Sequence, residues 1–508
     1  MSLTRRDFLR LVPVAAAAVA TESLASMMPG GGPGGRPTNV DPPPGGVLVE
    51  PELLELDRSV PGIAEGWLTV GATTVAIAGQ QARLLAYNGS FPGPTISVSK
   101  GERLRLHVTN ALSPDGGVNA LGFARGATNI HTHGWHVSPL DPMDNSARRI
   151  EPGDTWTYEY DLRRLKLGSL GWYHPHVHGL VAEQLWSGLA GALLVNDPNR
   201  SLADYETRLL ILKDIELSGG APEPYSYFSD FTFGKEGDTV MVNGAVHPVL
   251  SSRPGQVQRW RVVNASTARF YKLSLAGHAL HVVGTDGGLL DKPYPQSAIL
   301  LAPGERVDVL IKASDDAGGY KLLSLPYSRT GMMMGGGGWN AQQVTLLTLD
   351  VSGQPTNDVL PEHVRLRARR ATPDLSNLPH RDFVLAMYGG RGTINGYDFD
   401  SNPYTVTSQL PERGPGYEVW TIRNPMGMDH PWHQHVNGAQ ILSIQGGDAA
   451  YRALYATTPA WKDTVIVPRG GSVTELVRIQ NWTGSTMFHC HIVEHEDIGM
   501  MGEWVIES

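Results

Sequence analysis

The chain has a single cysteine, Cys490, among its 508 residues. No internal disulfide can form, so the hydrophobic core and any bound metal ion must stabilise the fold. Basic runs are also missing beyond the N-terminus, and the net charge at pH 7 is −9. Proteins that bind nucleic acid present clustered positive charge, so we expect no nucleic-acid partner. Hydrophobic residues at 41% and charged residues at 18% are otherwise ordinary for a soluble globular protein.

Long apolar runs are absent after the first residues, which read SLTRRDFLRLVPVAAAAVATESLASMM. Arg5 and Arg6, followed by an alanine-rich stretch that ends in small residues, resemble a twin-arginine export signal. We predict this signal at residues 1–26, with cleavage near Ala25, and a flexible Gly/Pro leader at residues 27–48. A transmembrane anchor is the alternative, but it needs about 20 apolar residues. We therefore expect export to the periplasm or the extracellular space, with no membrane span in the mature protein.

The 59 glycines and 36 prolines favour turns and short strands over long helices, so the composition indicates an all-β protein. A glycine-led turn, an alternating strand and an asparagine recur in KGERLRLHVTN (100–110), PGQVQRWRVVN (254–264) and GPGYEVWTIRN (414–424). A second element follows each of them: EPGDTWTYEYDL (151–162), APGERVDVLIKA (302–313) and PRGGSVTELVRI (468–479). The repeat predicts three similar antiparallel β-sandwich domains, at residues 49–200, 201–360 and 361–508.

Twelve of the 18 histidines lie in four short stretches: HTHGWH (131–136), HPHVH (174–178), HPWHQH (430–435) and HCHIVEH (489–495). Residues i and i+2 of a strand face the same side, so His-X-His places two imidazoles near enough to bind metal. One such pair is more often a solvated polar face, but four pairs in one chain indicate a metal site. The middle repeat reads FYKLSLAGHALH and GYKLLSLPY at the equivalent places. We therefore expect domains one and three to face each other across a shared site.

The lone cysteine lies in the fourth stretch, within MFHCHIVEHEDIGMM (487–501). A thiolate, two imidazoles and a weak thioether form the ligand set of blue-copper electron-transfer sites. Cys490, His495 and Met500 supply three of these four ligands. Structural zinc sites need more cysteines, and catalytic zinc uses three protein ligands, which leaves most of the histidines unexplained. Copper is therefore the metal that this pattern predicts.

In order and spacing, the four stretches resemble the copper-binding motifs of multicopper oxidases, in particular bacterial three-domain laccases and metallo-oxidases. The resemblance covers the chain from about residue 60 to its end, and it implies three Greek-key cupredoxin domains and four copper ions. A type 1 copper would be held by His430, Cys490 and His495, with Met500 rather than Met501 as the axial thioether. A type 2 copper and a type 3 pair would form a trinuclear cluster. The type 2 copper would be bound by His131 and His433. The type 3 pair would be bound by His133, His174, His176, His435, His489 and His491.

The resemblance also implies a reaction. Four one-electron oxidations of a donor at the type 1 copper would be coupled to the reduction of one O2 to two waters at the cluster. Because Cys490 lies between His489 and His491, adjacent residues would connect the two sites. Oxygen reduction consumes protons, and Glu496 matches the family's proton-relay acid. A second acid follows the first histidine stretch, and we favour Asp144 over Asp141 for it. His136 and His178 match no ligand position, so we interpret them as structural or supporting residues.

The identity of the electron donor stays open. A methionine as axial ligand indicates a low-to-moderate potential, which suits phenols, aromatic amines or reduced metal ions. Met332, Met333 and Met334 lie in a glycine-rich loop, and thioethers suit Cu(I), so a metallo-oxidase acting on Cu(I) or Fe(II) competes with a laccase. A surface loop that covers an apolar patch is the other interpretation of these methionines. A cupredoxin protein without turnover would be expected if ligands were missing, and none is missing. We expect a monomer.

Overall fold

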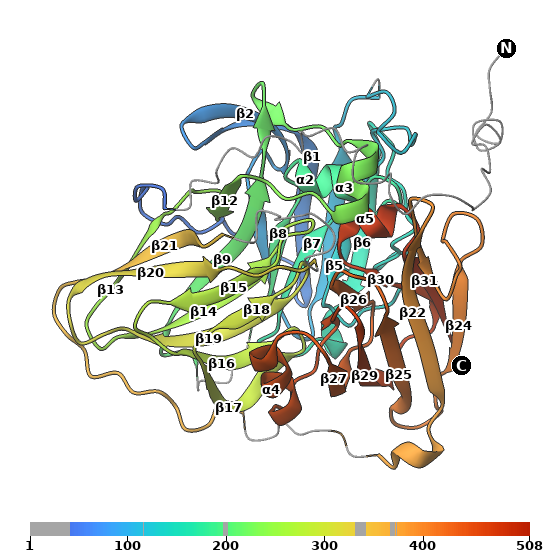
Figure 1. Ribbon diagram of the computed structural model, residues 1–508. Helices are drawn as coiled ribbons and strands as arrows, with labels where there is room; N and C mark the ends of the chain where they lie inside the picture. The colour runs from blue at the N-terminus through green and yellow to red at the C-terminus, as the bar shows by residue number, and fades with distance from the viewer. Residues whose placement is uncertain (1–40, 115, 197–201, 331–341, 366–370, 372) are drawn as a thin grey trace, which may run out of the picture. The chain divides into compact units, whose positions relative to one another are not determined.

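The structure of the protein, a computed structural model, describes residues 41–508 apart from 115, 197–201, 331–341, 366–370 and 372. The predicted export signal, most of the leader and the loop with Met332, Met333 and Met334 lie outside the described residues. Strands dominate the described chain (Figure 1), which confirms the all-β prediction. None of the helices in these residues is long and apolar enough to cross a membrane.

The strands form three pairs of sheets, besides a small ribbon of β10 and β11. Each pair draws on one third of the chain, and we call these the first, middle and third units. The first unit has the sheets β2-β1-β4-β6 and β3-β8-β7-β5. Its strands are β1 (Ile63–Ile77), β2 (Gln80–Tyr87), β3 (Gly93–Ser99), β4 (Arg103–Asn110), β5 (His131–His133), β6 (Thr155–Asp161), β7 (Leu170–His174) and β8 (Gly191–Asn196).

The middle unit has the sheets β12-β9-β14-β19-β16-β17 and β13-β21-β20-β15-β18. Its strands, with the ribbon, are β9 (Glu206–Ile215), β10 (Leu217–Ser218), β11 (Ala221–Pro222), β12 (Thr239–Val242), β13 (Val249–Ser252), β14 (Val257–Asn264), β15 (Tyr271–Leu275), β16 (Leu280–Thr285), β17 (Gly288–Gln296), β18 (Ile299–Leu301), β19 (Arg306–Lys312), β20 (Gly318–Leu325) and β21 (Val344–Val351).

The third unit has the sheets β23-β22-β25-β29-β27 and β24-β31-β30-β26-β28. Its strands are β22 (His380–Tyr388), β23 (Arg391–Ile394), β24 (Tyr404–Gln409), β25 (Gly416–Asn424), β26 (His430–Gln434), β27 (Ala439–Gln445), β28 (Thr464–Val467), β29 (Gly471–Ile479), β30 (Gly484–Cys490) and β31 (Met501–Glu507). The last strand of the first unit ends at Asn196 and that of the middle unit ends at Val351, and the third unit begins with β22 at His380.

The helices are short. They are α2 (Val181–Trp186), α3 (Tyr227–Phe233), α4 (Ala449–Thr457) and α5 (Val493–Asp497), with 3-10 turns η1 (Leu162–Arg164) and η4 (Leu375–Asn377). The third unit's α5 contacts α2 of the first unit and α3 of the middle unit (Figure 1). The Asp497 carboxylate accepts hydrogen bonds from the backbone N–H groups of Gly179 (2.7 Å) and Ala182 (2.8 Å) at the start of α2. The histidine-bearing C-terminal segment is thereby fastened to the first unit.

The sequence repeat corresponds to a structural repeat. The first element forms β4, β14 and β25, and each of these strands lies between one parallel and one antiparallel neighbour. The antiparallel neighbours β6, β19 and β29 come from the second element. The alternating Leu104, Leu106 and Val108 are fully buried, as period-two patterning requires of a strand with one face on a core. The prediction of three related β-units is confirmed.

The asparagine that ends each repeat makes the same kind of hydrogen bonds to backbone groups in all three units. Asn110, Asn264 and Asn424 are 0% exposed. The Asn264 amide donates to the backbone carbonyls of Arg269 (2.8 Å) and Leu301 (3.1 Å), and its carbonyl oxygen accepts from the Ser266 N–H (3.1 Å). Asn424 donates to the Met428 and Val467 carbonyls in the same way. Each asparagine thus satisfies buried backbone groups of a loop, and the loop that Asn424 holds leads directly into β26.

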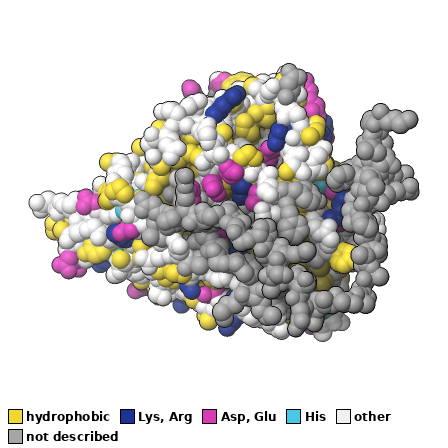
Figure 2. Space-filling view, turned by 45° about the horizontal axis from the view of Figure 1, so that its top comes forward, with side chains coloured by type: hydrophobic (Ala, Val, Ile, Leu, Met, Phe, Trp, Pro, Cys, Tyr) yellow, Lys and Arg dark blue, Asp and Glu magenta, His cyan; other side chains and the backbone are white. Residues whose placement is uncertain are grey.

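Apolar side chains from all three units meet in one buried cluster that includes Trp172, Leu209, Val263 and Val493. This cluster packs the units against each other close to the histidine stretches. At the surface, the described acidic and basic side chains on the face drawn in Figure 2 are interspersed, and little histidine is visible there. All the predicted ligand residues are buried, so the chemistry that the sequence predicts lies inside the molecule.

We predict that Asn264→Ala lowers the free energy of unfolding of the metal-free protein by about 3 kcal/mol, because buried backbone groups lose their partners at roughly 1–3 kcal/mol each. Denaturant unfolding followed by fluorescence measures the change. The matched control is Asn402→Ala at an exposed position, which should stay within about 0.5 kcal/mol of wild type. Equal effects of the two substitutions would contradict the role assigned to the repeated asparagine.

Candidate metal centre

Two strand pairs carry the four histidine stretches. In the first unit, β5 pairs with β7, and His131 lies opposite His174. In the third unit, β26 pairs with β30, and His433 lies opposite His489. The rings of the two units stack on each other, with centroids 3.8 Å apart for His133 and His433 and 4.0 Å for His131 and His435. The structure thus brings the histidines of the first and third units into direct contact.

The pleat of β30 separates the thiol from the neighbouring imidazoles. Successive side chains of a strand point to opposite faces, so Cys490 faces away from His489 and His491. The pairing of β30 with β26 continues past the strand end, where the His491 N–H donates to the Pro431 carbonyl (2.7 Å). His430 and His433 are three residues apart on β26 and also face opposite sides. His430 therefore lies on the side of Cys490, and His433 on the side of the histidine cluster.

The thiol side holds a compact triangle of three ligand atoms. The Cys490 Sγ lies 3.4 Å from His430 Nδ1 and 3.5 Å from His495 Nδ1, and the two nitrogens are 3.2 Å apart. The centre of such a triangle is ~2 Å from each corner, close to the bond that imidazole makes to a divalent metal such as zinc. Met500 is fully buried beside it, and its carbonyl accepts from the Cys490 N–H (3.1 Å). One metal ion fits between these side chains.

The other side holds eight imidazoles whose ring nitrogens converge. The Nε2 atoms of His176 and His435 lie 3.3 and 3.2 Å from the Nε2 of His489. His491 Nε2 lies 3.2 Å from His133 Nδ1. Potential ligand atoms within 4.8 Å of one another form three histidine groups, which are His131/His433/His435, His131/His133/His174 and His176/His435/His489.

The outward nitrogens of most of these rings are held by fixed acceptors. His131 Nδ1 contacts the Asp144 carboxylate (2.9 Å), and His174 Nδ1 contacts the Pro175 carbonyl (2.9 Å). His433 Nδ1 contacts the Asp463 carbonyl (2.9 Å) and His489 Nδ1 the Cys490 carbonyl (3.0 Å). An N–H that donates outward leaves the other nitrogen of the ring unprotonated and aimed at the cluster. Metal-binding histidines are oriented in this way.

Three of the inward nitrogens lack a hydrogen-bond partner in the described part of the chain. Among the described residues, the Nε2 atoms of His131, His174 and His433 are buried without a hydrogen bond, although buried polar atoms are normally paired. Burial, and then the neighbouring imidazoles, hold the pKa of His435 well below its usual value, so its ring is neutral. Burial also raises the pKa of the Cys490 thiol, and a bound cation would supply the charge that stabilises its thiolate. Imidazoles, thiolate and thioether are ligands that copper takes, so the residues fit that metal.

Two acids were candidates beside the first histidine stretch, and the structure separates them. Asp144 is 4% exposed, and its carboxylate contacts His131 Nδ1 and accepts from the Thr132 N–H (2.8 Å). Asp141 instead pairs with Arg148 near the surface. Of these two acids, Asp144 is therefore the one that orients the imidazole of His131.

Glu496, on α5, lies beside the cluster. Its carboxylate oxygens are 3.2 Å from His489 Nδ1 and 3.5 Å from His176 Nε2. Neither oxygen has a hydrogen-bond partner among the described residues. Burial, with the nearby carboxyls of Asp497 and Glu494, raises the pKa of Glu496 well above its usual value. The geometry places this carboxyl group against the predicted site of oxygen reduction.

The two leftover histidines stay outside the cluster. His136 Nδ1 bonds the Val436 carbonyl (2.7 Å), and its Nε2 contacts the Asn481 amide (2.8 Å). His178 pairs with Asp400 (3.0 Å). Both side chains connect the first unit to the third. They contribute to the interface that holds the cluster rather than to the cluster itself.

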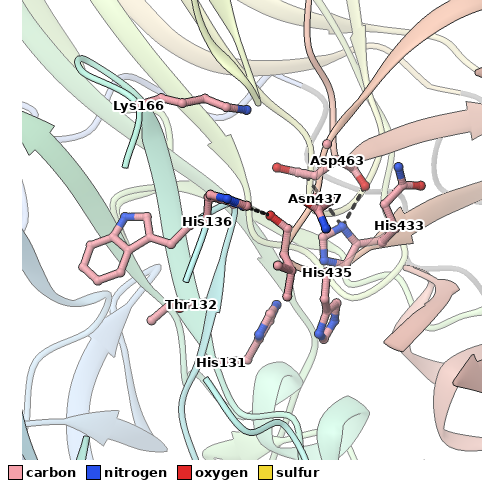
Figure 3. A pocket seen from close by; sticks show the side chains of 13 residues that line it. His131, Thr132, His136, Lys166, His433, His435, Asn437 and Asp463 are labelled. Carbon is pink, nitrogen blue, oxygen red and sulfur yellow. Dashed lines mark hydrogen bonds and ion pairs between the residues drawn. The ribbon is translucent and has the colours of Figure 1, made fainter. Parts of the chain in front are cut away.

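A narrow pocket of about 20 Å³ reaches the cluster and is lined by His131, His433, Lys166 and Asn437, among others. That volume suits about one water molecule. Figure 3 shows His131 beside His435 and places His433 next to Asp463. The Asp463 carboxylate lies 3.2 Å from His133 Nε2, a contact that sequence reasoning missed. Asp463 belongs to the stretch WKDTVIVP, which contains no histidine, so the sequence offered no signal for its role.

Comparison with known proteins agrees with this geometry. Three family models, each described as multicopper oxidase, match residues 69–200, 171–335 and 369–508. The laccase of Bacillus subtilis (strain 168) is 28% identical over 475 residues, which cover 82% of this chain and 89% of the laccase. The cell division protein FtsP of Shigella dysenteriae serotype 1 is 29% identical over 524 residues, covering 100% of this chain and 99% of FtsP. A multicopper oxidase structure from Campylobacter jejuni, described as a metallo-oxidase, matches with a TM-score of 0.78 and 27% identity, over 92% of this chain and 96% of that one.

We predict that Asp144→Ala weakens metal retention at the His131 position by about 10–100-fold, the usual cost of losing the group that orients a ligand. Elemental analysis after dialysis against a graded chelator series measures it. Asp141→Ala is the matched control, since a surface ion pair contributes little, and it should behave as wild type. Equal retention in the two variants would show that the contact with His131 has no such role.

Proposed function

We propose that this chain, which belongs to the multicopper oxidase family, is a laccase-type oxidase. It would couple one-electron oxidation of phenols or aromatic amines to the four-electron reduction of O2 to water. The observation that carries the proposal is the complete donor set, in which a buried triangle of one thiol and two imidazoles and a group of eight convergent imidazoles are joined by consecutive residues of one strand. We further propose export by the twin-arginine route and a monomeric state.

The donor set would hold four copper ions. The triangle of His430, Cys490 and His495 would hold one ion near Met500, and the eight imidazoles would hold three. Copper at these positions supplies one-electron redox chemistry and the site where O2 is reduced. Four donor molecules each lose one electron, and four electrons, four protons and one O2 yield two waters.

The protein supplies the connection between the two sites. The Cys490 side chain reaches the triangle, and its backbone continues directly into His489 and His491, whose rings lie in the cluster. Electrons therefore have a route through consecutive covalent bonds. Burial separates the side chains of both sites from bulk water, so an acidic side chain beside the cluster would deliver protons to it. Glu496, in contact with two of the imidazoles, is the acid that we propose for this role.

The alternative to an enzyme is a protein of the same fold that binds a partner and catalyses no reaction. The complete donor set argues against this alternative. The relative named as a cell division protein matches the whole chain, so the fold alone does not distinguish catalysis from binding. A protein that only binds a partner has no need for buried ring nitrogens without hydrogen-bond partners. Their presence favours an enzyme.

Oxidation of reduced metal ions is the second candidate, because access to His495 is restricted. His495 is 0% exposed, and its Nε2 contacts the Thr232 carbonyl of α3 (3.2 Å). A bulky phenol cannot touch the imidazole in this conformation, whereas electrons from a small ion bound nearby can reach it through α3 or its neighbours. Met332, Met333 and Met334 are thioethers that suit such an ion, Cu(I) above all.

We predict that the copper-loaded protein consumes O2 with a phenolic donor, and that changing Met332, Met333 and Met334 together to alanine leaves this activity intact. Oxygen uptake with the phenol and, separately, with Cu(I) is the measurement. Cys490→Ser is the negative control and should abolish both activities, because it removes the thiolate of the electron-entry site. If the triple variant loses only Cu(I) oxidation, the protein is a metallo-oxidase. No uptake with either donor at full copper loading would contradict an oxidase.

We predict that Glu496→Gln slows steady-state O2 uptake by at least about 100-fold, the usual contribution of a positioned proton donor. Anaerobic reduction of the blue copper by the donor should remain as fast as in wild type, since that step consumes no proton at the cluster. Glu494→Gln is the matched control, because that carboxylate is bound by the Tyr225 hydroxyl and the Lys235 N–H. Unchanged uptake in Glu496→Gln would exclude this residue as the proton donor.

A further inference from the structure

We propose that the middle unit, which supplies none of the predicted ligands, positions the trinuclear site through Gly304 and Arg306. This inference rests on the proposed function. The two residues lie in and after the loop between β18 and β19, within the repeat element APGERVDVLIKA. They act on the cluster through two separate contacts, one made by the backbone and one by a buried arginine.

The backbone contact is made at Gly304. Its φ is +84°, and a Cβ there would lie 2.9 Å from Cδ2 of His491 and 3.0 Å from Cε1 of His133. These two imidazoles come from the third and the first unit, and their facing nitrogens are 3.2 Å apart. The loop of the middle unit therefore packs directly on the pair of rings that would share one copper ion. Only glycine allows this approach at this backbone conformation.

The arginine contact runs through Asp463. The Arg306 guanidinium is 0% exposed and donates to both carboxylate oxygens of Asp463, at 2.6 and 2.7 Å. The same carboxylate lies 3.2 Å from His133 Nε2, the outward nitrogen of that ring. Thr464, the next residue, contacts His133 and His433 at 3.1 Å each. Arg306 thus fixes the carboxylate that orients an imidazole of the first unit.

Arg306 also ties the three units together. Its Nε donates to the Leu170 carbonyl of β7 in the first unit (3.1 Å), while Asp463 belongs to the third unit. Gly134, the residue after His133, has no Cβ where one would collide with the guanidinium. Behind Arg306, Lys462 of the third unit bridges Asp286 and Glu305 of the middle unit at 2.8 Å each. The middle unit is therefore bound to both halves of the cluster at the same point.

The geometry of the guanidinium explains why arginine is needed. A planar fork can grip a carboxylate with two parallel hydrogen bonds and still donate to carbonyls on its other side. A lysine ammonium keeps the charge but cannot make all of these bonds together. Without the two hydrogen bonds from the guanidinium, the Asp463 carboxylate loses its fixed orientation. The His133 imidazole that this carboxylate contacts then loses its orientation as well. A group that orients a metal-binding histidine typically changes metal affinity about 10–100-fold when it is removed.

The test compares Arg306→Met and Arg306→Lys with wild type, all in the full chain loaded with copper. Copper per chain is measured by elemental analysis, the type 2 copper by electron paramagnetic resonance, and the thiolate site by its blue absorption. We expect both variants to keep the blue absorption and to release cluster copper to a chelator about 10–100-fold faster than wild type, with the methionine variant at the upper end. Should Arg306→Met fail to fold, Arg306→Lys decides, because it retains the buried charge.

Arg259→Met is the matched control. Arg259 is another buried arginine of the middle unit, and it pairs with Asp308 on β19. This variant should lose thermal stability to a similar extent while releasing cluster copper at the wild-type rate. Wild-type release by Arg306→Lys, or equally fast release by Arg259→Met, would overturn the inference. Loss of the blue absorption in step with cluster copper would also overturn it, because that pattern indicates general destabilisation. If wild type itself takes up no copper, the proposed function fails, and the inference with it.

Discussion

The close packing of eight buried imidazoles is the constraint on which the rest of this structure depends. Neutral imidazoles whose unprotonated nitrogens converge repel one another, and water cannot enter to satisfy them. The protein holds them by fixing the opposite nitrogen of most rings to a backbone carbonyl or a carboxylate, as at His131, His174 and His433. A bound cation turns the same arrangement from repulsive to attractive. Metal binding would therefore stabilise the folded form of this site.

The geometry of the strands determines which side chains face each of the two sites. On β30 the pleat sends Cys490 to one face and its two histidine neighbours to the other. On β26 a spacing of three residues does the same for His430 and His433. Two paired strands can therefore carry ligands for both sites without any loop between them. The proposed electron route spans only one residue, because His489 and Cys490 are consecutive on β30.

The ligand stretches and the repeat could be predicted from the sequence because they are local. His-X-His, the lone cysteine and the glycine-led strands each lie within a few residues, and strand periodicity translates them directly into faces. Asp144 and Asp141 could not be separated in this way, since both follow the same stretch and only tertiary packing sets one against His131. The roles of Asp463 and Arg306 could not be predicted from the sequence, because the contact between them joins residues that are 157 apart in the chain. The middle repeat lacks histidine pairs, so the sequence contains no sign of the contact that this unit makes with the histidine cluster through Gly304.

A shared cluster raises a problem that a site within one domain does not have, namely that small shifts between units would separate its ligands. Residues that bridge the units therefore matter as much as the ligands. Relatives named as a laccase and as a cell division protein both match this chain, so the fold alone does not indicate the function. A buried polar atom without a hydrogen bond lowers the free energy of unfolding by about 1–3 kcal/mol. Among the described residues, three inward ring nitrogens are buried without a hydrogen bond. A chain that used the fold only to bind a partner could replace these side chains with apolar ones and become more stable. The unpaired nitrogens, rather than the fold, are therefore the feature of this structure that indicates metal binding.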